Sequence, residues 1–473
     1  MLTGMTRPKR ILWLTYDHWR YDQLGWAGHP HARTPNLDRL AAGGVYCENA
    51  FCQAPVCMPS RGSFMTGLYP SRVGVTANGY ELDPEHPNVA SRRIGGAGYH
   101  TAQVGKLHLA AHEDQDLREP APARYGFDLF YLSEERGCYD SAYFKWLRGK
   151  YPDAVEALRE SRPTDPARSS EVRVRIADAP PEATHAGWVV DQTCRLFRSP
   201  WDRRYDQPWF VHMGFHHPHP PLNPTATAFA PWKDHVYPAP RRYPDEAADK
   251  PSGLADMLRT GEQRSDEYLT TYRRGLDALV TEMDTVLGRL LDQLEAEGAL
   301  DDTLIIAHSD HGDMAGDHGL THKGPHFYDE VMRCPVLFHW PAGGLCGGRR
   351  FTGLMELVDV LPTILEAAGV QSHLPMDGRS VFQRLTGEME GSHRDAVFAC
   401  MNDRAMVRTT NHKLIYFGES GEYVLYDYSD PDPERINHAS DPAYSGVLGN
   451  LKERLMWQLA QNQQSATSRR FRF

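Results

Sequence analysis

Short apolar segments alternate with helical segments along this chain, and this alternation limits the fold more than any other feature of the sequence. The apolar segments have the length and composition of buried β-strands, and they cover Arg10–Tyr16, His100–Val104, Trp209–Phe215, Thr303–His308 and Pro335–His339. Residues Glu267–Glu297 repeat apolar side chains with the 3.6-residue period of an amphipathic helix, which Gly298 would end. We therefore predict an α/β fold in which a large mixed, mostly parallel sheet is sandwiched by helices.

The pattern changes after about residue 350. Strands are expected at Asp395–Met406, His412–Phe417 and Glu422–Tyr428, and an amphipathic helix near Leu448–Gln461. We predict a main domain at residues 1–350, with an insertion at about 112–207, and a smaller C-terminal α+β subdomain with a tail at residues 351–473. The tail ends in Arg-Arg-Phe-Arg-Phe, which is typical either of a frayed end or of a segment docked on a neighbouring subunit in a homo-oligomer.

The bulk composition excludes several kinds of partner. The formal net charge is −11, whereas a nucleic-acid-binding protein needs a basic surface, so we expect no nucleic-acid partner. No stretch approaches the roughly 20 apolar residues of a transmembrane helix, so we expect no membrane partner. The apolar run Ile11–Leu14 is too short for a signal peptide, and we expect a cytoplasmic protein. The 8 cysteines include no Cys-x-x-Cys pair, so most are expected to be reduced and buried.

Polar clusters directly follow several of the predicted strands. These clusters are Asp17-His18, Lys106-Leu107-His108, His216-His217-Pro218-His219 and Asp310-His311-Gly312. In an open α/β sheet, ligands bind beyond the carboxyl ends of the strands. We therefore expect these side chains, which are distant in sequence, to converge on one edge of the sheet.

The acidic members of these clusters predict a metal site. Asp17 and Asp310 would supply hard oxygen ligands, and His311 a nitrogen ligand or a neighbouring donor. Two carboxylates at one sheet edge repel each other unless a cation lies between them. A divalent ion there would also neutralise the oxygens of a bound sulfate or phosphate group.

The segment Cys57-Met58-Pro59-Ser60-Arg61-Gly62, followed by Thr66-Gly67, predicts an anion-binding helix start. Pro59 suits a first helical turn, and a group at a helix N-terminus faces unpaired N–H donors. We expect Arg61, Lys106 and Lys323 to bind the oxygens of an anionic substrate. The candidates for acid–base catalysis are His108, His217 and His219, while Asn78 could donate an amide N–H to the substrate.

The stretch from Cys57 to Gly67 resembles the signature of the formylglycine sulfatases of the alkaline phosphatase superfamily. The resemblance spans nearly the whole chain, and the other segments that carry it are Thr34–Asp38, Gly105–His108, Pro218–Pro220, Ser309–Gly319, Lys323-Gly324, Leu425–Asp427 and Asp432–Glu434. It implies an alkaline-phosphatase-like fold and metal-dependent hydrolysis of a small sulfate monoester to an alcohol and sulfate. It also implies that a formylglycine-generating enzyme oxidises Cys57 to formylglycine (3-oxoalanine), whose hydrate is the nucleophile.

The resemblance assigns roles to individual residues. Asp17, Asp310 and His311 match metal ligands, together with the formylglycine hydrate at position 57. Arg61 matches the residue that supports this hydrate, and Lys106 and Lys323 match sulfate-binding lysines. His108 matches the residue next to the hydrate, and His219 the residue near the leaving-group oxygen. We expect His18, Asn78 and His217 to contact the substrate.

One position departs from the family pattern. Many members carry a second acidic residue after the first metal aspartate, where this chain has His18. His18 either ligates the metal or contacts the substrate. An oxygen-rich site favours calcium, which we expect here, whereas an added imidazole favours manganese or zinc. The departure also leaves open a phosphonate monoester or phosphodiester hydrolase on the same scaffold, and a third reading is a non-catalytic relative with an unmodified Cys57.

Overall fold

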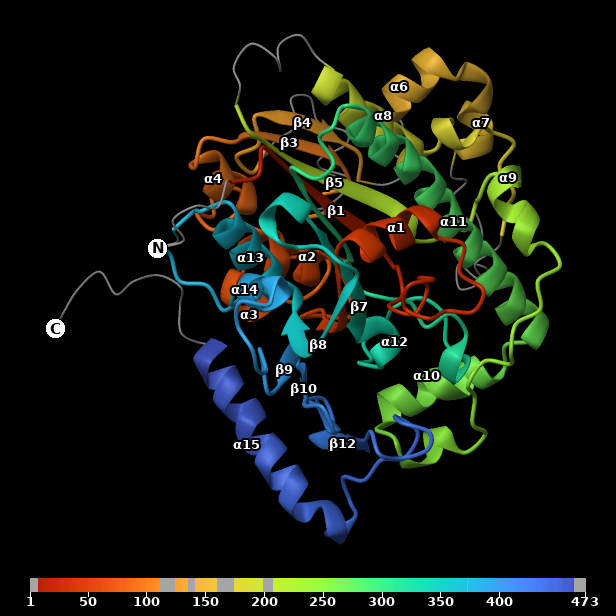
Figure 1. Cartoon of the computed structure of the whole chain (residues 1–473). Helices are drawn as coiled ribbons and strands as arrows, with labels where there is room; N and C mark the ends of the chain where they lie inside the picture. The colour runs from red at the N-terminus through yellow and green to blue at the C-terminus, as the bar shows by residue number, and fades with distance from the viewer. Residues whose placement is uncertain are drawn as a thin grey trace.

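A computed structural model describes residues 7–110, 124–134, 141–159, 174–198, 207–371 and 373–462 of the chain. Its centre is an eight-stranded sheet with the strand order β4-β3-β5-β1-β6-β7-β2-β8 (Figure 1). The bounds of these strands are β1 Arg10–Asp17, β2 Val45–Phe51, β3 His100–Gly105, β4 Leu129–Leu132, β5 Trp209–Pro218, β6 Thr303–Ser309, β7 Arg333–His339 and β8 Arg349–Glu356.

The direction of the strands places their carboxyl ends at one edge. β1 pairs in parallel with both β5 and β6, and β3 pairs in parallel with β4 and β5. β7 is antiparallel to its neighbours β6 and β2, while β2 is parallel to β8. The sheet is therefore mixed but mostly parallel, as predicted, and β1, β2, β3, β5 and β6 all end on the same side.

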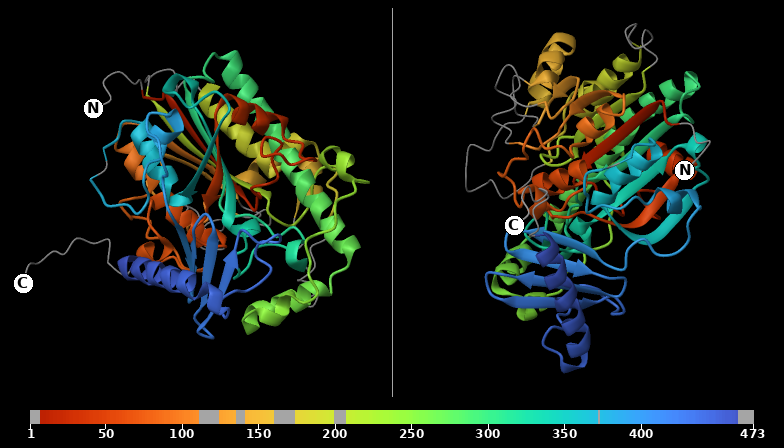
Figure 2. Two further views of the ribbon diagram at one scale, coloured as in Figure 1. Left: turned by 60° about the horizontal axis from the view of Figure 1, so that its bottom comes forward. Right: turned by 90° about the vertical axis from the view of Figure 1, so that its left-hand side faces the viewer.

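Helices cover both faces of this sheet (Figures 1 and 2). Alternate residues of β1 face opposite sides, because Ile11 and Trp13 belong to one apolar cluster and Leu12 and Leu14 to the other. The helix bounds are α1 Pro35–Gly43, α2 Cys57–Thr66, α3 Pro70–Val73, α4 Ala90–Gly95, α6 Ala142–Lys150, α7 Val155–Leu158, α8 His185–Arg198, α9 Ala226–Phe229, α10 Ser252–Glu262, α11 Asp266–Ala296, α12 Asp329–Met332, α13 Val360–Ala367, α14 Phe382–Thr386 and α15 Ser445–Asn462. The predicted long helix is α11, which Ser265 caps by accepting a hydrogen bond from the backbone N–H of Tyr268.

A smaller antiparallel sheet has the strand order β12-β11-β10-β9 and lies beside the large sheet (Figure 2). Its strands are β9 Val397–Met401, β10 Arg404–Arg408, β11 His412–Phe417 and β12 Glu422–Asp427. One of its faces packs on α15 through residues such as Val407, Leu414 and Leu455. The other face, which carries Met406 and Ile415, joins the main apolar core, so the two sheets share one core.

The structure corrects several element predictions. The segment expected as one strand at Asp395–Met406 is a hairpin of β9 and β10, whose turn begins at Asn402 with a φ of 52°. β2, β4 and β8 were not predicted. β8 begins with two arginines at the edge of the sheet, and none of its first five residues is fully buried, so it lacks a continuous apolar signal.

The observed strands and helices can be compared with the predicted domain limits. Within the segment 112–207, β4 pairs with β3 in the large sheet and α8 packs against β5, so these described parts belong to the main layers. β8 spans residue 350 and belongs to the large sheet, so that sheet continues past the predicted limit. The tail after Asn462, on which the homo-oligomer prediction rests, lies outside the described residues. Among the described helices, none combines the length and apolarity needed to cross a bilayer.

Candidate active site

The predicted polar clusters meet at the carboxyl edge of the large sheet. Asp17 is the last residue of β1, Lys106 follows β3, and Asp310 follows β6. The segment after β2 leads into α2, whose first residue is Cys57. Because these strands end on the same side, residues from four separate parts of the sequence surround one point.

Cys57 lies at the start of α2, and the local sequence accounts for this position. Val56 is extended, Pro59 occupies the first turn, and Gly67 ends the helix in a left-handed conformation with a φ of 69°. Cys57 is the first residue of α2 and its side chain is buried, so it lies at the positive dipole end of the helix. This environment favours an anion at position 57.

Four side chains form a buried group that could hold a metal ion. The ligand atoms of Asp17, Cys57, Asp310 and His311 all lie within 4.8 Å of one another. Cys57 Sγ is 3.3 Å from His311 Nε2 and 3.6 Å from Asp17 Oδ1. His311 Nδ1 donates to the carbonyl of Gly312 at 2.9 Å, which leaves Nε2 directed at the group. Two carboxylates, one imidazole and the atom at position 57 are a donor set that fits a divalent cation.

Three cationic side chains surround this group. Lys106 Nζ is 2.7 Å from Asp17 Oδ2, and Arg61 Nε donates to Asp310 Oδ2 at 2.7 Å. Lys323 Nζ contacts Cys57 Sγ and lies 3.9 Å from Asp17 Oδ1. The structure therefore brings together all the cations that were predicted to bind substrate oxygens.

The pKa shifts reflect how strongly these charges act on one another. Burial would raise the pKa of Asp17, but Lys106 and Lys323 outweigh it and hold that pKa well below its usual range. Burial would lower the pKa of His311, but the Asp310 carboxylate outweighs it and raises the pKa to about 9. Positive charge is thus stabilised where the carboxylates and His311 meet, which is where a divalent cation would bind.

His18 and His219 lie together beside Asp17. Their ring centroids are 4.4 Å apart, and their ligand atoms form a second close group with Asp17. Burial lowers the pKa of both imidazoles, and the positive charge of Lys323 lowers it further. Both side chains are therefore neutral near pH 7. His219 Nδ1 donates to the carbonyl of Pro220, so its Nε2 carries a lone pair.

His108 is held by an acidic residue that sequence reasoning missed. Both carboxylate oxygens of Glu134 accept hydrogen bonds from the His108 backbone N–H, at 2.9 and 2.8 Å. His108 itself has a φ of 55°, a left-handed conformation that is uncommon for a residue with a side chain. Glu134 fixes this turn from just beyond β4, in a region with no motif that could have indicated it.

Two predicted substrate contacts have other partners in the structure. The Asn78 side-chain oxygen accepts a hydrogen bond from the Met58 backbone N–H at 3.0 Å, so Asn78 caps the first turn of α2. His217 Nε2 is 2.8 Å from the carboxylate of Glu282, which belongs to α11. His217 therefore lies outside the Cys57 group, because successive residues of a strand point to opposite faces.

A hydrogen-bonded chain behind His18 was also not predicted. Asp313 accepts from His18 Nδ1 at 2.8 Å and from the Tyr272 hydroxyl at 2.7 Å. The ligand atoms of His18, Asp313 and His322 form a third close group. Asp313 belongs to the Ser309–Gly319 stretch and could have been singled out there, whereas Tyr272 lies in the middle of α11 and gave no signal.

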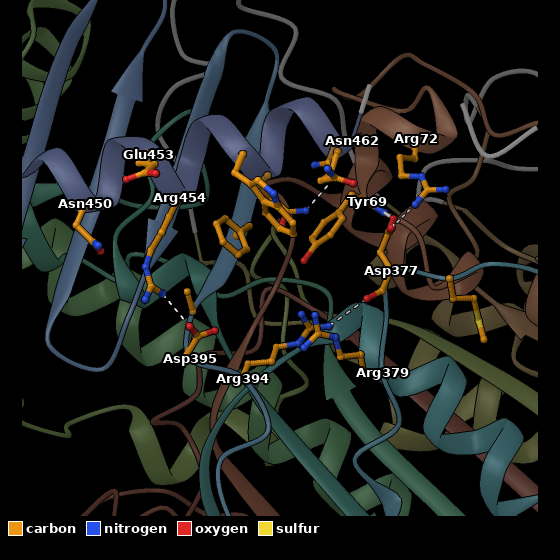
Figure 3. Close-up of a pocket in the computed structure, with 16 residues that line it drawn as sticks. Tyr69, Arg72, Asp377, Arg379, Arg394, Asp395, Asn450, Glu453, Arg454 and Asn462 are labelled. Carbon is orange, nitrogen blue, oxygen red and sulfur yellow. Dashed lines mark hydrogen bonds and ion pairs between the residues drawn. The ribbon is translucent and has the colours of Figure 1, made fainter. Parts of the chain in front are cut away.

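One cleft on the described part of the chain lies away from this chemistry. It has a volume of about 790 Å³ and is lined by α3, α15 and residues 376–398 (Figure 3). Its charged side chains are largely paired, as Figure 3 shows for Arg454 with Asp395 and for Arg72 with Asp377. None of the strand-end residues lines it. The buried group around Cys57 is therefore the better candidate for the active site.

Comparison with known families assigns most of the chain. The family described as Sulfatase matches residues 9–370, and the family described as N-sulphoglucosamine sulphohydrolase, C-terminal, matches residues 316–462. The first match contains every element that contributes to the Cys57 group.

Individual relatives match over nearly their full length. An arylsulfatase of Clostridium perfringens is 27% identical over 98% of this chain and 96% of its own. The multifunctional alkaline phosphatase superfamily protein PehA of Trinickia caryophylli is 27% identical over 98% of this chain and 97% of its own. Among solved structures, the phosphonate monoester hydrolase of Agrobacterium radiobacter is 26% identical and covers 96% of both chains with a TM-score of 0.82.

Proposed function

This chain belongs to the sulfatase family, and on that premise we propose that it hydrolyses small sulfate monoesters to an alcohol and inorganic sulfate. The observation that carries the proposal is the buried group of Asp17, Cys57, Asp310 and His311, whose ligand atoms lie within 4.8 Å of one another at the start of a helix. A tetrahedral anion fits a helix N-terminus that is flanked by lysine and arginine side chains.

Cys57 would be the precursor of the nucleophile. We propose that a formylglycine-generating enzyme converts it to formylglycine, whose hydrate supplies a hydroxyl nucleophile and allows sulfate to leave by elimination. Arg61 and Lys106 hold the Asp310 and Asp17 carboxylates that face position 57. Because these partners are buried and already paired, they need little reorganisation when charge develops on the substrate.

Asp17, Asp310 and His311 would hold one divalent cation. When bound, such an ion neutralises substrate oxygens and acts as a Lewis acid. The residues themselves are pre-arranged for it: Ser60 donates to the Asp310 carbonyl at 2.6 Å, and the His311 backbone N–H donates to Asp310 Oδ1 at 2.9 Å. The first bond fixes the Asp310 backbone and the second orients its carboxylate before any ion arrives.

The leaving group would point toward Lys323 and His219. Among the residues around position 57, these two side chains are only partly buried, whereas Asp17, Arg61 and Asp310 are fully buried. His219 is neutral and its Nε2 carries a lone pair, so we assign the proton for the departing oxygen to the ammonium group of Lys323. His108, held by Glu134, would accept the proton of the remaining hydroxyl of the formylglycine hydrate when sulfate is released.

A second candidate is hydrolysis of phosphonate monoesters or phosphodiesters. Two observations favour it: the structural likeness to the phosphonate monoester hydrolase of Agrobacterium radiobacter, and His18 at a position where many sulfatases carry an acid. The same cations and helix end would bind a phosphonate group. The substrate preference therefore depends on details that kinetics can resolve.

The test is a side-by-side kinetic profile on 4-nitrophenyl sulfate, 4-nitrophenyl phenylphosphonate and bis(4-nitrophenyl) phosphate. The enzyme batch should have its Cys57 conversion quantified by peptide mass spectrometry. We expect the largest kcat/KM for the sulfate. A larger value for the phosphonate or the diester would replace the first proposal by the second, and activity on none of them would contradict both.

A further inference from the structure

The imidazole of His18 has one nitrogen that no described residue satisfies. His18 follows Asp17 in a left-handed backbone conformation with a φ of 71°, which is uncommon for a residue with a side chain. Its side chain is fully buried. Within the described part of the chain, Nε2 has no hydrogen-bond partner, and it lies 3.9 Å from Asp17 Oδ1. A buried, unsatisfied nitrogen at this place points to a ligand.

Asp313 determines which nitrogen of His18 carries the proton. Asp313 Oδ2 is 2.8 Å from His18 Nδ1, and Asp313 Oδ1 accepts the backbone N–H of Ala315 at 2.8 Å. An ionised carboxylate can only accept, so Nδ1 is the protonated nitrogen of His18. The Nε2 lone pair is then directed away from Asp313, toward the side of the ring where Asp17 lies.

Tyr272 completes this arrangement from α11. The His322 backbone N–H donates to the Tyr272 hydroxyl oxygen at 3.2 Å, so the hydroxyl hydrogen is free to donate to Asp313 Oδ2 at 2.7 Å. Tyr272 is buried on a helix of 31 residues, which is a rigid support. Asp313 thus accepts from His18 and Tyr272 at Oδ2 and from Ala315 at Oδ1, and it cannot rotate without losing these bonds.

We propose that Asp313 and Tyr272 are positioning residues that hold His18 Nε2 toward the cation at Asp17, so that the site selects manganese or zinc over calcium. The inference rests on the proposed function and deepens it by naming the kind of cation. His311 presents its Nε2 in the same way, through an Nδ1–H bond to a carbonyl. Two imidazole nitrogens suit manganese or zinc, whereas calcium takes oxygen ligands. From the sequence we expected calcium, with manganese or zinc as the alternative, and the proposal takes that alternative.

The proposal depends on the contact between the Asp313 carboxylate and Nδ1 of His18. Histidines that bind metals usually donate their other ring N–H to such a partner, and losing the partner costs about 10- to 100-fold in metal affinity. The partner fixes the ring orientation and the protonated nitrogen. Asp313→Asn should therefore weaken a nitrogen-preferring metal, while a metal bound through Asp17 and Asp310 oxygens should be little affected.

The experiment measures metal affinity on the full-length, chelator-treated protein with manganese, zinc and calcium separately. We expect the unmodified sequence to bind manganese and zinc more tightly than calcium. Asp313→Asn should weaken manganese and zinc by about 10- to 100-fold and leave calcium nearly unchanged. His18→Asp should reverse the preference toward calcium. Asp317→Asn is the matched control, because this buried aspartate in the same stretch pairs with Arg20 and Arg273 instead of His18.

Further readouts keep the test decisive. Circular dichroism checks folding. If Asp313→Asn fails to fold, Tyr272→Phe tests the same hydrogen-bonded chain of Tyr272, Asp313 and His18. This variant lacks one hydrogen bond, and its manganese affinity should fall by about 2- to 10-fold. Electron paramagnetic resonance of bound manganese should show nitrogen coupling that decreases in His18→Asp. Equal weakening of all three metals, or a calcium preference in the unmodified protein, would overturn the inference. Failure to bind any divalent cation would overturn the proposed cation site as well, whereas sulfatase activity with unchanged selectivity in His18→Asp would overturn only this inference.

Discussion

Side chains of opposite charge surround the buried side chain at position 57. Cys57 Sγ lies within 3.6 Å of both Asp17 and His311, and Lys323 contacts it from the partly exposed side. A thiol needs no such surroundings to pack in a core, where it behaves as a small hydrophobe. The arrangement fits the proposed oxygen nucleophile beside a cation, and on that proposal the chemistry depends on the oxidation of Cys57.

Replacing Cys57 tests this residue directly. Cys57→Ala should abolish sulfatase turnover and leave the fold intact, because the side chain has catalytic rather than packing importance. Cys57→Ser should bind a sulfo group and stall, because an ordinary serine ester cannot eliminate sulfate. Initial rates, circular dichroism and intact-mass spectrometry report these outcomes. Near-normal turnover by Cys57→Ala, or repeated turnover by Cys57→Ser, would contradict the proposed nucleophile.

Lys323 is proposed to protonate the leaving oxygen. The effect of its replacement on kcat/KM should therefore depend on the leaving group. Lys323→Met should lower kcat/KM for an alkyl sulfate by about 100-fold or more, because general-acid assistance contributes about 10²- to 10⁴-fold. The loss for 4-nitrophenyl sulfate should be much smaller, since nitrophenolate departs without a proton. The control is Lys233→Met at an exposed position, which should change neither value. An equal loss on both esters would assign Lys323 to sulfate binding alone.

At the level of elements, the start of α2 is the part that the chemistry depends on. Asn78 accepts the Met58 backbone N–H, and Ser60 and Arg61 of the same helix bind Asp310 after β6. Ser60 and Arg61 therefore join the first turns of α2 to the end of β6, and Asn78 caps the start of the helix. A shift of α2 would move the nucleophile relative to the proposed cation ligands.

Asn78 allows this capping role to be separated from substrate binding. Asn78→Asp keeps an oxygen acceptor for Met58 N–H, whereas Asn78→Ala removes it and should cost about 1 kcal/mol of stability. We expect Asn78→Asp to retain KM within a few-fold and Asn78→Ala to lower kcat and the melting temperature together. If Asn78 instead bound the substrate, the added negative charge of Asn78→Asp would raise KM strongly. Steady-state kinetics with thermal unfolding distinguishes the two.

The elements that sequence reasoning could identify are those with continuous local signals. β1 and β5 carry the apolar runs Ile11–Leu14 and Trp209–Val211, α11 keeps its period over many turns, and Pro59 marks a helix start in the Cys57 stretch. The positions of Asp17, Lys106 and Asp310 followed from the rule that parallel strands end at one edge.

The missed features depend on contacts between distant segments. Glu134 reaches His108 from just beyond β4, and Tyr272 reaches Asp313 from α11, so neither has a local motif. His217 was expected at the substrate because it lies in a histidine-rich run. Its strand geometry turns it toward Glu282 instead. Local pattern identifies residue types at the sheet edge, but it does not determine which of them share a face.

At the scale of the whole molecule, charge is distributed unevenly. The chain has a formal net charge of −11, yet Arg61, Lys106 and Lys323 are gathered around position 57. A cationic site within an acidic protein retains small anions by local field rather than by general surface attraction. This distribution fits a small anionic ester better than a long polyanion, which would meet the acidic surface as well.

The buried histidines predict how stability depends on pH. Burial lowers the pKa of His308 to about 4, and its Nε2 accepts the indole N–H of Trp13 at 2.6 Å, so it is neutral in the folded state. In the unfolded chain a histidine binds a proton below about pH 6.5. Stability should therefore fall as pH decreases from about 6.5 to 4, with His308 contributing up to about 1.4 kcal/mol per pH unit.

Thermal unfolding at pH 7, 6 and 5 measures this effect. The melting temperature of the unmodified protein should fall as the pH decreases. The melting temperature of His308→Gln should fall less steeply, because this variant lacks one titrating group. Comparison of slopes rather than of absolute values separates the lost proton from the cost of the substitution itself. A His308→Gln slope equal to or steeper than that of the unmodified protein would contradict the assignment of His308 as neutral.

The proposed mechanism requires an oxidised Cys57 for sulfate ester hydrolysis. The most direct measurement prepares batches that differ in exposure to a formylglycine-generating enzyme, quantifies formylglycine at position 57 by peptide mass spectrometry, and determines 4-nitrophenyl sulfate turnover per total enzyme. We expect turnover to be proportional to the converted fraction, on a line through the origin. Turnover that persists at zero conversion, or that does not rise with conversion, would contradict the proposed mechanism.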